Sequence, residues 1–460
     1  MLARIPLVTL LCFLLLSELV TASSTSLNRV RRDAYTTLRA ATHGGNGPQL
    51  TTVGATPPGA HAANIPVGNN GANVFAWVSS TPAQESSATS AYIILHGIDR
   101  NAGFYYNVLS NANQAALRAM LPGASPNTLL VAPLFFSTTQ DVRAYNASSL
   151  AWADPNAWTG GDGSTHPESS NVSVFTVLDT LLEKYSKYSG MRNVTFVAHG
   201  GGAQVLQRYA VVGKDPPNSN VAVRYVIGDP SSMLYFTRDR PVPFNPATCP
   251  MYDDFRYGFS NYTAPYALEP DSPRDLFRRY IARDVRYVIG LGDVVKDEGD
   301  QLCAGRATGG AERKDRSLDY WAYLNLLANT TGSTPDYPGF YPALDTRKRG
   351  DPRGYVTSTP EERQGFATGQ LRHQMYYING AGHNADQVYG SGDGQKAIFG
   401  AAAPAVSLSG SASSSTSMSA AGPTGTREPA LGGQNGGTAQ RSGPISLVGL
   451  VFLLAVGFCT

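Results

Sequence analysis

The chain has 460 residues and nearly balances 36 basic against 34 acidic side chains, for a formal net charge of +2. This composition, without a long basic run, excludes nucleic acid as an implied partner. Four cysteines without C-x-x-C spacing, and histidines without H-E-x-x-H spacing, give no signal for a metal site, and no cofactor is expected.

The N-terminal region reads as an export signal followed by a polar segment. Residues 1–22 combine Arg4, a long apolar run and small residues at Val20-Thr21-Ala22, which is typical of a cleaved signal peptide. Residues 23–61 are rich in Thr, Ser, Gly and Pro and form a linker or pro-segment. Within them, Arg29-Val30-Arg31-Arg32 is either a dibasic processing site or a solvated charge cluster.

Residues 62–400 have the pattern of one α/β domain. Apolar, β-branched runs alternate with segments of helical periodicity, which predicts a mainly parallel sheet with helices on both faces. An example of the helices is Val174 to Tyr185, with its apolar positions on one stripe. The expected inner strands are Ala91 to Leu95, Leu129 to Val131, Val194 to Val197, Tyr225 to Ile227, Tyr287 to Ile289 and Met375 to Ile378.

One strand-to-helix junction has the form of a nucleophile elbow. The motif G-x-S-x-G turns a buried strand sharply into a helix and raises the side chain of its middle residue above the sheet. Here a strand over Asn193 to Ala198 and a helix over Ala203 to Val212 flank a run of small residues. The nucleophile position is Gly200, which keeps the turn but supplies no oxygen.

Ligands bind beyond the carboxyl ends of the strands in such sheets, so the loops that follow them are the candidate site. Asp293 follows one predicted strand and His383 follows the next, both downstream of the elbow. The resulting chain order is nucleophile, acid and histidine. Ser231 and Ser232 follow a different strand, and nothing in the sequence positions them against His383.

The C-terminal region predicts surface attachment. Residues 401–444 are dominated by Ser, Thr, Gly, Ala and Pro, which cannot bury a core and indicate a flexible stalk. The apolar tail at residues 445–460 is short against the roughly 20 residues of a membrane helix. With Asn435, Gly436 and Gly437 before it, the tail favours a glycosylphosphatidylinositol (GPI) signal over a terminal membrane helix. We therefore expect an extracellular, membrane-anchored protein.

Cysteines and glycosylation acceptors agree with export. Cys12 lies in the signal and Cys459 in the tail, so Cys249 and Cys303 are expected to pair in an oxidising compartment. Asn193 opens a buried strand and is the least suitable acceptor. The four remaining N-x-S/T sites are predicted to carry sugar, namely Asn146, Asn171, Asn261 and Asn329.

Taken in order, these motifs give a definite resemblance over roughly residues 62–400. The chain resembles the α/β-hydrolases and is similar to secreted fungal esterase-like or lipase-like members of that superfamily. The residues that carry the resemblance are His96-Gly97 with Arg100-Asn101, the elbow Ala198 to Gln204, Asp229-Pro230-Ser231-Ser232, Gly292-Asp293, and Gly382-His383 followed by Ile398-Phe399-Gly400.

The resemblance implies roles for the site residues. His383 would be the general base and Asp293 its partner, with Asp297 and Asp300 as competing candidates for the acid. The oxyanion donors would be the backbone N–H of Gly201 and a group of the Gly97 to Ile98 loop.

Two functions follow from the missing serine. One is a pseudoenzyme that keeps the pocket and binds a small-molecule, cell-wall or lipid ligand. The other is a hydrolase that uses His383 and Asp293 as a general-base pair without a covalent intermediate.

Overall fold

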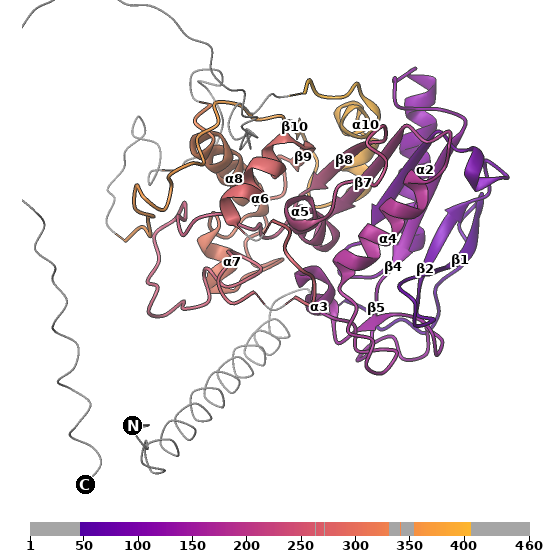
Figure 1. Cartoon of the computed structure of the whole chain (residues 1–460), viewed down its shortest axis with the longest axis horizontal. Coiled ribbons are helices and arrows are strands. Elements are labelled where there is room, and N and C mark those ends of the chain that lie inside the picture. The colour runs from indigo at the N-terminus through magenta and orange to yellow at the C-terminus, as the bar shows by residue number, and fades with distance from the viewer. Residues whose placement is uncertain (1–46, 263, 271, 331–340, 342–353, 406–460) are drawn as a thin grey trace, which may run out of the picture. The chain divides into compact units, whose positions relative to one another are not determined.

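The computed structural model describes residues 47–262, 264–270, 272–330, 341 and 354–405 (Figure 1). The predicted signal segment, the stalk beyond residue 405 and the apolar tail lie outside the described residues. The first strand begins at Ala60 and the last helix ends at Phe399. No helix of the described part is long and apolar enough to cross a membrane.

An eight-stranded sheet forms the centre of the domain, in the order β1-β2-β4-β3-β7-β8-β9-β10. The strands from β4 onward in this order run parallel, whereas β1 and β2 are antiparallel to each other and β2 is antiparallel to β4. This mainly parallel sheet with helices on both faces confirms the predicted α/β-hydrolase fold. The strands are β1 (Ala60–Pro66), β2 (Asn73–Ser79), β3 (Ser90–Leu95), β4 (Thr128–Leu134), β7 (Asn193–His199), β8 (Ala222–Gly228), β9 (Asp284–Gly290) and β10 (Gln374–Ile378).

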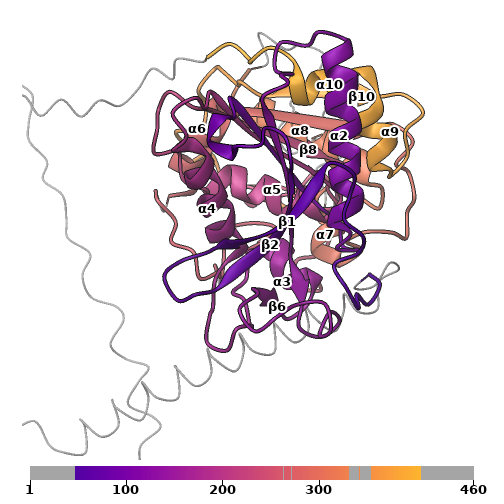
Figure 2. The same ribbon diagram turned by 90° about the vertical axis from the view of Figure 1, so that its right-hand side faces the viewer.

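Helices cover the two faces of the sheet unequally. Figure 2 shows α2, α9 and α10 on one side and α4 and α6 on the other. The helices are α2 (Ala102–Arg118), α3 (Pro155–Gly160), α4 (Val174–Ser186), α5 (Gly201–Val212), α6 (Pro273–Ala282), α7 (Cys303–Ala307), α8 (Arg313–Leu327), α9 (Ala385–Gly390) and α10 (Gly392–Phe399). A short 3-10 helix spans Glu85–Ser87, and β5 (Phe136–Ser137) pairs with β6 (Ala151–Trp152) apart from the main sheet.

The period-2 alternation of the strands divides the core into two layers. In β3, Ile93 and Leu95 pack with α4, α5, α6 and α8, whereas Tyr92 and Ile94 pack with α2, α9 and α10. Because both faces of the inner strands are covered, these strands read in the sequence as continuous apolar runs.

Local signals in the sequence set where the helices begin. The hydroxyl of Ser173 accepts a hydrogen bond from the N–H of Phe175 and caps α4, and Ser391 caps α10 in the same way. Asp154 caps α3 with Pro155 in its first turn. These caps satisfy N–H groups that the helices cannot satisfy internally.

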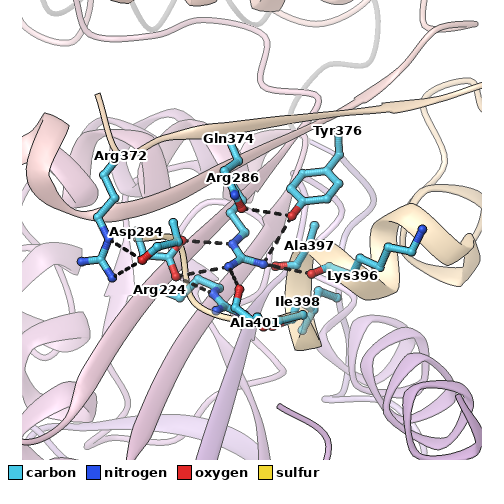
Figure 3. Close-up of polar contacts among 12 residues, drawn as sticks. Arg224, Asp284, Arg286, Arg372, Gln374, Tyr376, Lys396, Ala397, Ile398 and Ala401 are labelled. Atoms are coloured by element: carbon cyan, nitrogen blue, oxygen red, sulfur yellow. Dashed lines mark hydrogen bonds and ion pairs between the residues drawn. The ribbon is translucent and has the colours of Figure 1, made fainter. Parts of the chain in front are cut away.

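Arginines tie the last helix to the amino ends of β8 and β9 (Figure 3). The carboxylate of Asp284 pairs with the Nε of Arg224 at 2.9 Å and with the Nε of Arg286 at 3.0 Å. Arg224 also donates to the carbonyl of Ile398, and Arg286 to that of Lys396, at 2.7 and 2.9 Å. We call Arg224, Asp284 and Arg286 the arginine cluster.

The predicted disulfide is confirmed. Cys249 is buried in the long connection between β8 and α6, and Cys303 opens α7, with a Cα–Cα distance of 5.8 Å. The bond therefore joins the connection between β8 and α6 to the start of α7.

The four predicted glycosylation acceptors are all exposed, while Asn193 at the start of β7 is half-buried. Their modification stays a prediction.

Candidate active site

The elbow keeps the backbone of a nucleophile turn although its central residue is glycine. Strand β7 ends at His199 and α5 begins at Gly201, so Gly200 alone makes the turn, with φ 57° and ψ −118°. This conformation is accessible to glycine and strained for other residues. The N–H of Gly200 donates to the carbonyl of Gly228 at 3.0 Å, which fixes the turn against β8.

A second glycine lets the helix approach the sheet. A Cβ on Gly202 would lie 2.5 Å from the carbonyl oxygen of His96 and 2.8 Å from that of Leu95. The start of α5 therefore packs directly on the end of β3, and only glycine fits there. Both features indicate a turn of the elbow type.

His383 and Asp293 meet beside this turn. The Nδ1 of His383 lies 2.8 Å from the Oδ2 of Asp293, and the Nη1 of Arg313 donates to the other oxygen at 2.9 Å. Burial raises the pKa of Asp293, but the hydrogen bond from His383 and the charges of His383 and Arg313 outweigh it and hold the pKa below its ordinary value. The carboxylate is therefore ionised and accepts the Nδ1–H of His383, which leaves Nε2 on the side of Gly200.

Backbone bonds between two loops hold this pair in register. The N–H of Gly292 donates to the carbonyl of Ala381 at 2.8 Å, and the N–H of Leu291 donates to Ile378 at 3.1 Å. Asn384, which directly follows His383, caps α9 by accepting from the N–H of Gln387 at 3.1 Å. The loops after β9 and β10 thus present the acid and the histidine together.

The imidazole of His383 lies next to the space that a nucleophilic side chain at residue 200 would occupy. A Cβ built on Gly200 would lie 2.9 Å from Nε2 of His383 and 3.2 Å from its Cε1. A serine at this position would therefore sit within reach of the base after His383 shifts by a few tenths of an ångström. The site holds the base, its acid and the turn, but no hydroxyl at the turn.

The predicted oxyanion segments also lie together. A Cβ on Gly201 would lie 3.1 Å from the backbone nitrogen of Ile98, so the first N–H of α5 and the N–H of Ile98 belong to one small region. N–H groups in the first turn of a helix have no intrahelical partner. They are available to a carbonyl oxygen or an anion.

Buried side chains hold the Gly97 to Ile98 loop. Nδ1 of His96 donates to the carbonyl of Gly97 at 2.8 Å, and its Nε2 accepts from the N–H of Phe135 at 2.9 Å. Burial lowers the pKa of His96 to about 4, so this ring stays neutral. Arg100 pairs with the buried Asp141 at 2.6 Å and donates to the carbonyl of Ile98 at 2.7 Å. Both His96 and Arg100 are positioning residues.

A pocket of about 430 Å³ opens over these groups. Gly200, Gly201 and His383 line it, and Phe104 and Tyr105 of α2 add aromatic surface. Polar atoms also reach it from Asp99, Ser231, Glu298 and Arg313. The volume suits a small ligand or one end of a larger one.

The other candidate acids and nucleophiles lie elsewhere. Asp297 is exposed, while Asp300 is buried and accepts from the hydroxyl of Tyr257 at 2.6 Å. Ser231 lines the pocket, but its hydroxyl accepts from the Nε of Arg313 at 3.1 Å. The hydroxyl of Ser232 donates to Gln204 at 2.8 Å. None of these four residues makes a contact with His383 that the structure records.

Two further polar residues at the site were not singled out from the sequence as site residues. His199 immediately precedes Gly200, and its ring lies 4.5 Å from that of His383 between centroids. Its Nε2 lies 3.3 Å from Oδ2 of Asp229, without the alignment of a hydrogen bond. Burial, and then the charge of His383, lower the pKa of His199. The sequence signal that could have identified His199 and Asp229 is their position at the ends of the neighbouring strands β7 and β8.

No protein-family model matches the chain, and no curated protein matches it. Among solved structures, a poly(aspartic acid) hydrolase from Sphingomonas sp. KT-1 is similar, with 14% identity, 75% of this chain and 99% of that chain covered, and a TM-score of 0.47. A poly(3-hydroxybutyrate) depolymerase from Bordetella parapertussis has 15% identity, 71% and 86% coverage and a TM-score of 0.43.

A siderophore hydrolase from Aspergillus nidulans has 13% identity, 72% and 92% coverage and a TM-score of 0.34. At such identities and TM-scores, the fold assignment depends on the strand order of this chain itself. The chemistry of the site has to be argued from its own residues.

Proposed function

We propose that this α/β-hydrolase-like domain is a catalytically impaired pseudoenzyme that binds a carbonyl-bearing ligand in its pocket and does not form an acyl-enzyme. The observation that carries the proposal is the glycine at the turn. A Cβ at Gly200 would face Nε2 of His383 at 2.9 Å, so the base is in place and the atom that it would deprotonate is missing. Loss of the nucleophile in a serine hydrolase costs about 10⁶-fold in turnover.

The features that remain support binding. The N–H groups of Ile98 and Gly201 lie in one region of the pocket, and the ionised Asp293 fixes the tautomer of His383. A ligand carbonyl or carboxylate would accept hydrogen bonds there. Phe104 and Tyr105 would cover the apolar part of the same ligand.

One observation favours a second candidate. Because Nδ1 of His383 is committed to Asp293, its Nε2 faces the pocket as a free acceptor and would serve as a general base toward a water molecule. The domain would then hydrolyse an ester or a related bond directly. This candidate needs the His383 and Asp293 pair but does not need a residue at position 200.

Ester turnover by a set of variants separates the two candidates. If the domain is a pseudoenzyme, any turnover by the native domain should be the same in His383→Ala. Turnover by Gly200→Ser should be at least about 10²-fold higher than that of the native domain, which is a small part of the rate that a nucleophilic serine contributes. Gly200→Ala is the matched control, since it brings the same backbone strain without the hydroxyl. Native turnover that His383→Ala abolishes would instead establish the second candidate.

We also propose that the domain is exported and held at the cell surface by its C-terminal segment, as a glycoprotein. The disulfide between Cys249 and Cys303 supports an oxidising compartment. Release of the protein from intact cells by a phosphatidylinositol-specific phospholipase tests the lipid anchor. Retention after that treatment would favour a terminal membrane helix.

A further inference from the structure

Three polar residues near Gly200, namely His199, Asp229 and His383, form a cluster that the proposed ligand binding does not require. One ring nitrogen of His199, one of His383 and a carboxylate oxygen of Asp229 all lie within 4.8 Å of one another. The three residues come from the ends of β7, β8 and β10, where the parallel strands bring them together. Two imidazoles and one carboxylate form a ligand set that binds divalent transition metals.

The buried members of this group lack well-formed hydrogen bonds. His199 is 2% exposed and Asp229 is not exposed, yet Nε2 of the first and Oδ2 of the second have no hydrogen-bond partner. The two atoms face each other at 3.3 Å, which is within ion-pair range but longer than the roughly 2.7–2.9 Å of a charge-assisted hydrogen bond and lacks its alignment. Buried polar atoms of native proteins are normally satisfied, so two adjacent ones need an explanation.

We propose that His199, Asp229 and His383 bind one Zn²⁺ ion beside Gly200, with the fourth coordination position open to the pocket. Zinc bonds to nitrogen and oxygen are about 2.0–2.2 Å long, which makes the edge of a coordination tetrahedron about 3.4 Å. The 3.3 Å between His199 and Asp229 matches that edge. A ring nitrogen of His383 lies within 4.8 Å of both atoms, and this 26% exposed side chain would turn to bring its Nε2 to the ion.

The surroundings of the three residues fit an outer shell for the metal. A ligating histidine commonly donates its other N–H to a carboxylate, which is the relation between His383 and Asp293 at 2.8 Å. The second oxygen of Asp229 accepts from the N–H of Gly290 at 2.9 Å, so that carboxylate is also oriented. Asp229 itself has φ 45°, an unusual backbone conformation that is common at functional sites.

Gly200 supplies the room for the ion. A Cβ there would lie 2.9 Å from Nε2 of His383, where a bound ion would need free space. The absence of a side chain at residue 200 therefore leaves space beside Nε2 of His383. The inference is independent of the pseudoenzyme proposal, because ligand binding through the N–H groups of Ile98 and Gly201 does not require zinc, whereas the second candidate would need Nε2 of His383 free of the metal.

Titration of the purified, chelator-treated protein with Zn²⁺ by isothermal calorimetry tests the proposal. We expect one equivalent to bind to the native protein. Binding should weaken at least tenfold in variants of the three ligands, and by about 10–100-fold in the outer-shell variant Asp293→Asn. The ligand variants are Asp229→Asn, which retains an oxygen for Gly290, and His383→Gln, which changes a partly exposed loop residue that the fold does not need. His61→Gln, at an exposed histidine of β1, is the matched control.

Absorption of the Co²⁺-loaded protein gives a second readout. An intense visible band of tetrahedral cobalt that is lost in His383→Gln and weakened in Gly200→Ala supports the site. The proposal is overturned if native protein binds no Zn²⁺, or if His383→Gln binds it as tightly as His61→Gln does. Either result leaves the effect of Gly200→Ser on ester turnover unchanged, so the two proposals fail separately.

Discussion

The two ends of the parallel strands use charge in opposite ways. At the amino ends, Asp284 and Arg286 of the arginine cluster are buried, Arg224 is half-buried, and the groups are bonded to one another and to backbone carbonyls of residues 396–401. At the carboxyl ends, His199 and Asp229 are as deeply buried, but their facing atoms lack hydrogen bonds and the turn beside them has a positive φ. The first arrangement is the one expected of a group that stabilises the fold, and the second is the one expected where polar atoms serve a ligand.

The largest effect in this comparison is expected at the amino ends. Arg286 is fully buried and bonds to both Asp284 and the end of α10. Arg286→Met should lower the free energy of unfolding by about 3–5 kcal/mol, because it leaves the buried carboxylate and several carbonyls with fewer partners. Urea denaturation followed by circular dichroism measures it. If Arg286→Met lowers the free energy of unfolding less than Gly200→Ala does, the amino ends of the strands are not the more important for stability.

Asp284→Asn should cost about 1.5–3 kcal/mol at neutral pH, as expected for hydrogen bonds to charged groups. Burial raises the pKa of Asp284, but Arg224 and Arg286 outweigh it and lower the pKa below the unfolded value. Its contribution is therefore fully present above the unfolded pKa of about 3.9 and is lost as the pH falls through the lower folded pKa.

The free energy of unfolding, measured between pH 7 and pH 2, should fall with decreasing pH in the native protein and should fall less in Asp284→Asn. Parallel curves for the two proteins would mean that this pair does not contribute to acid sensitivity.

Gly200→Ala should cost about 1–3 kcal/mol, because a residue with a Cβ is strained at φ 57° and the methyl group would press on His383. Thermal unfolding by calorimetry measures this change. A neutral or stabilising result would show that the turn relaxes, and that the elbow conformation is not imposed by its neighbours.

The smallest effect is expected at His383. Its side chain is partly exposed, and the amide of a glutamine can donate to Asp293 in place of Nδ1–H, so His383→Gln should change the free energy of unfolding by no more than about 1 kcal/mol. The same denaturation assay compares it with Arg286→Met. A larger loss would give this histidine a structural role and weaken the distinction between the two ends.

The sequence was sufficient for the inner strands, since each predicted run lies within an observed strand, as Ala91 to Leu95 does within β3. It did not reveal β1 and β2 as strands. The run Ala60–Pro66 is rich in alanine, ends in proline and has an exposed face, so it carries no clear period. An edge strand such as β1 depends on pairing that a local pattern does not encode.

The site was partly predictable for the same reason. Loops that follow parallel strands meet at one edge, which was enough to select Asp293 and His383 as candidates. The pairing of His199 with Asp229 depends on the lateral order of β7 and β8, together with the backbone twist at Asp229. The position of the His383 ring against Gly200 depends on bonds between loops, which spacing alone does not give.

The most direct test of the disarmed elbow is labelling by a serine-directed fluorophosphonate probe. The native protein and Gly200→Ala should remain unlabelled, whereas Gly200→Ser should be labelled at residue 200, as peptide mass spectrometry would show. Labelling of the native protein at any serine of the pocket would contradict the claim that the site lacks a nucleophile.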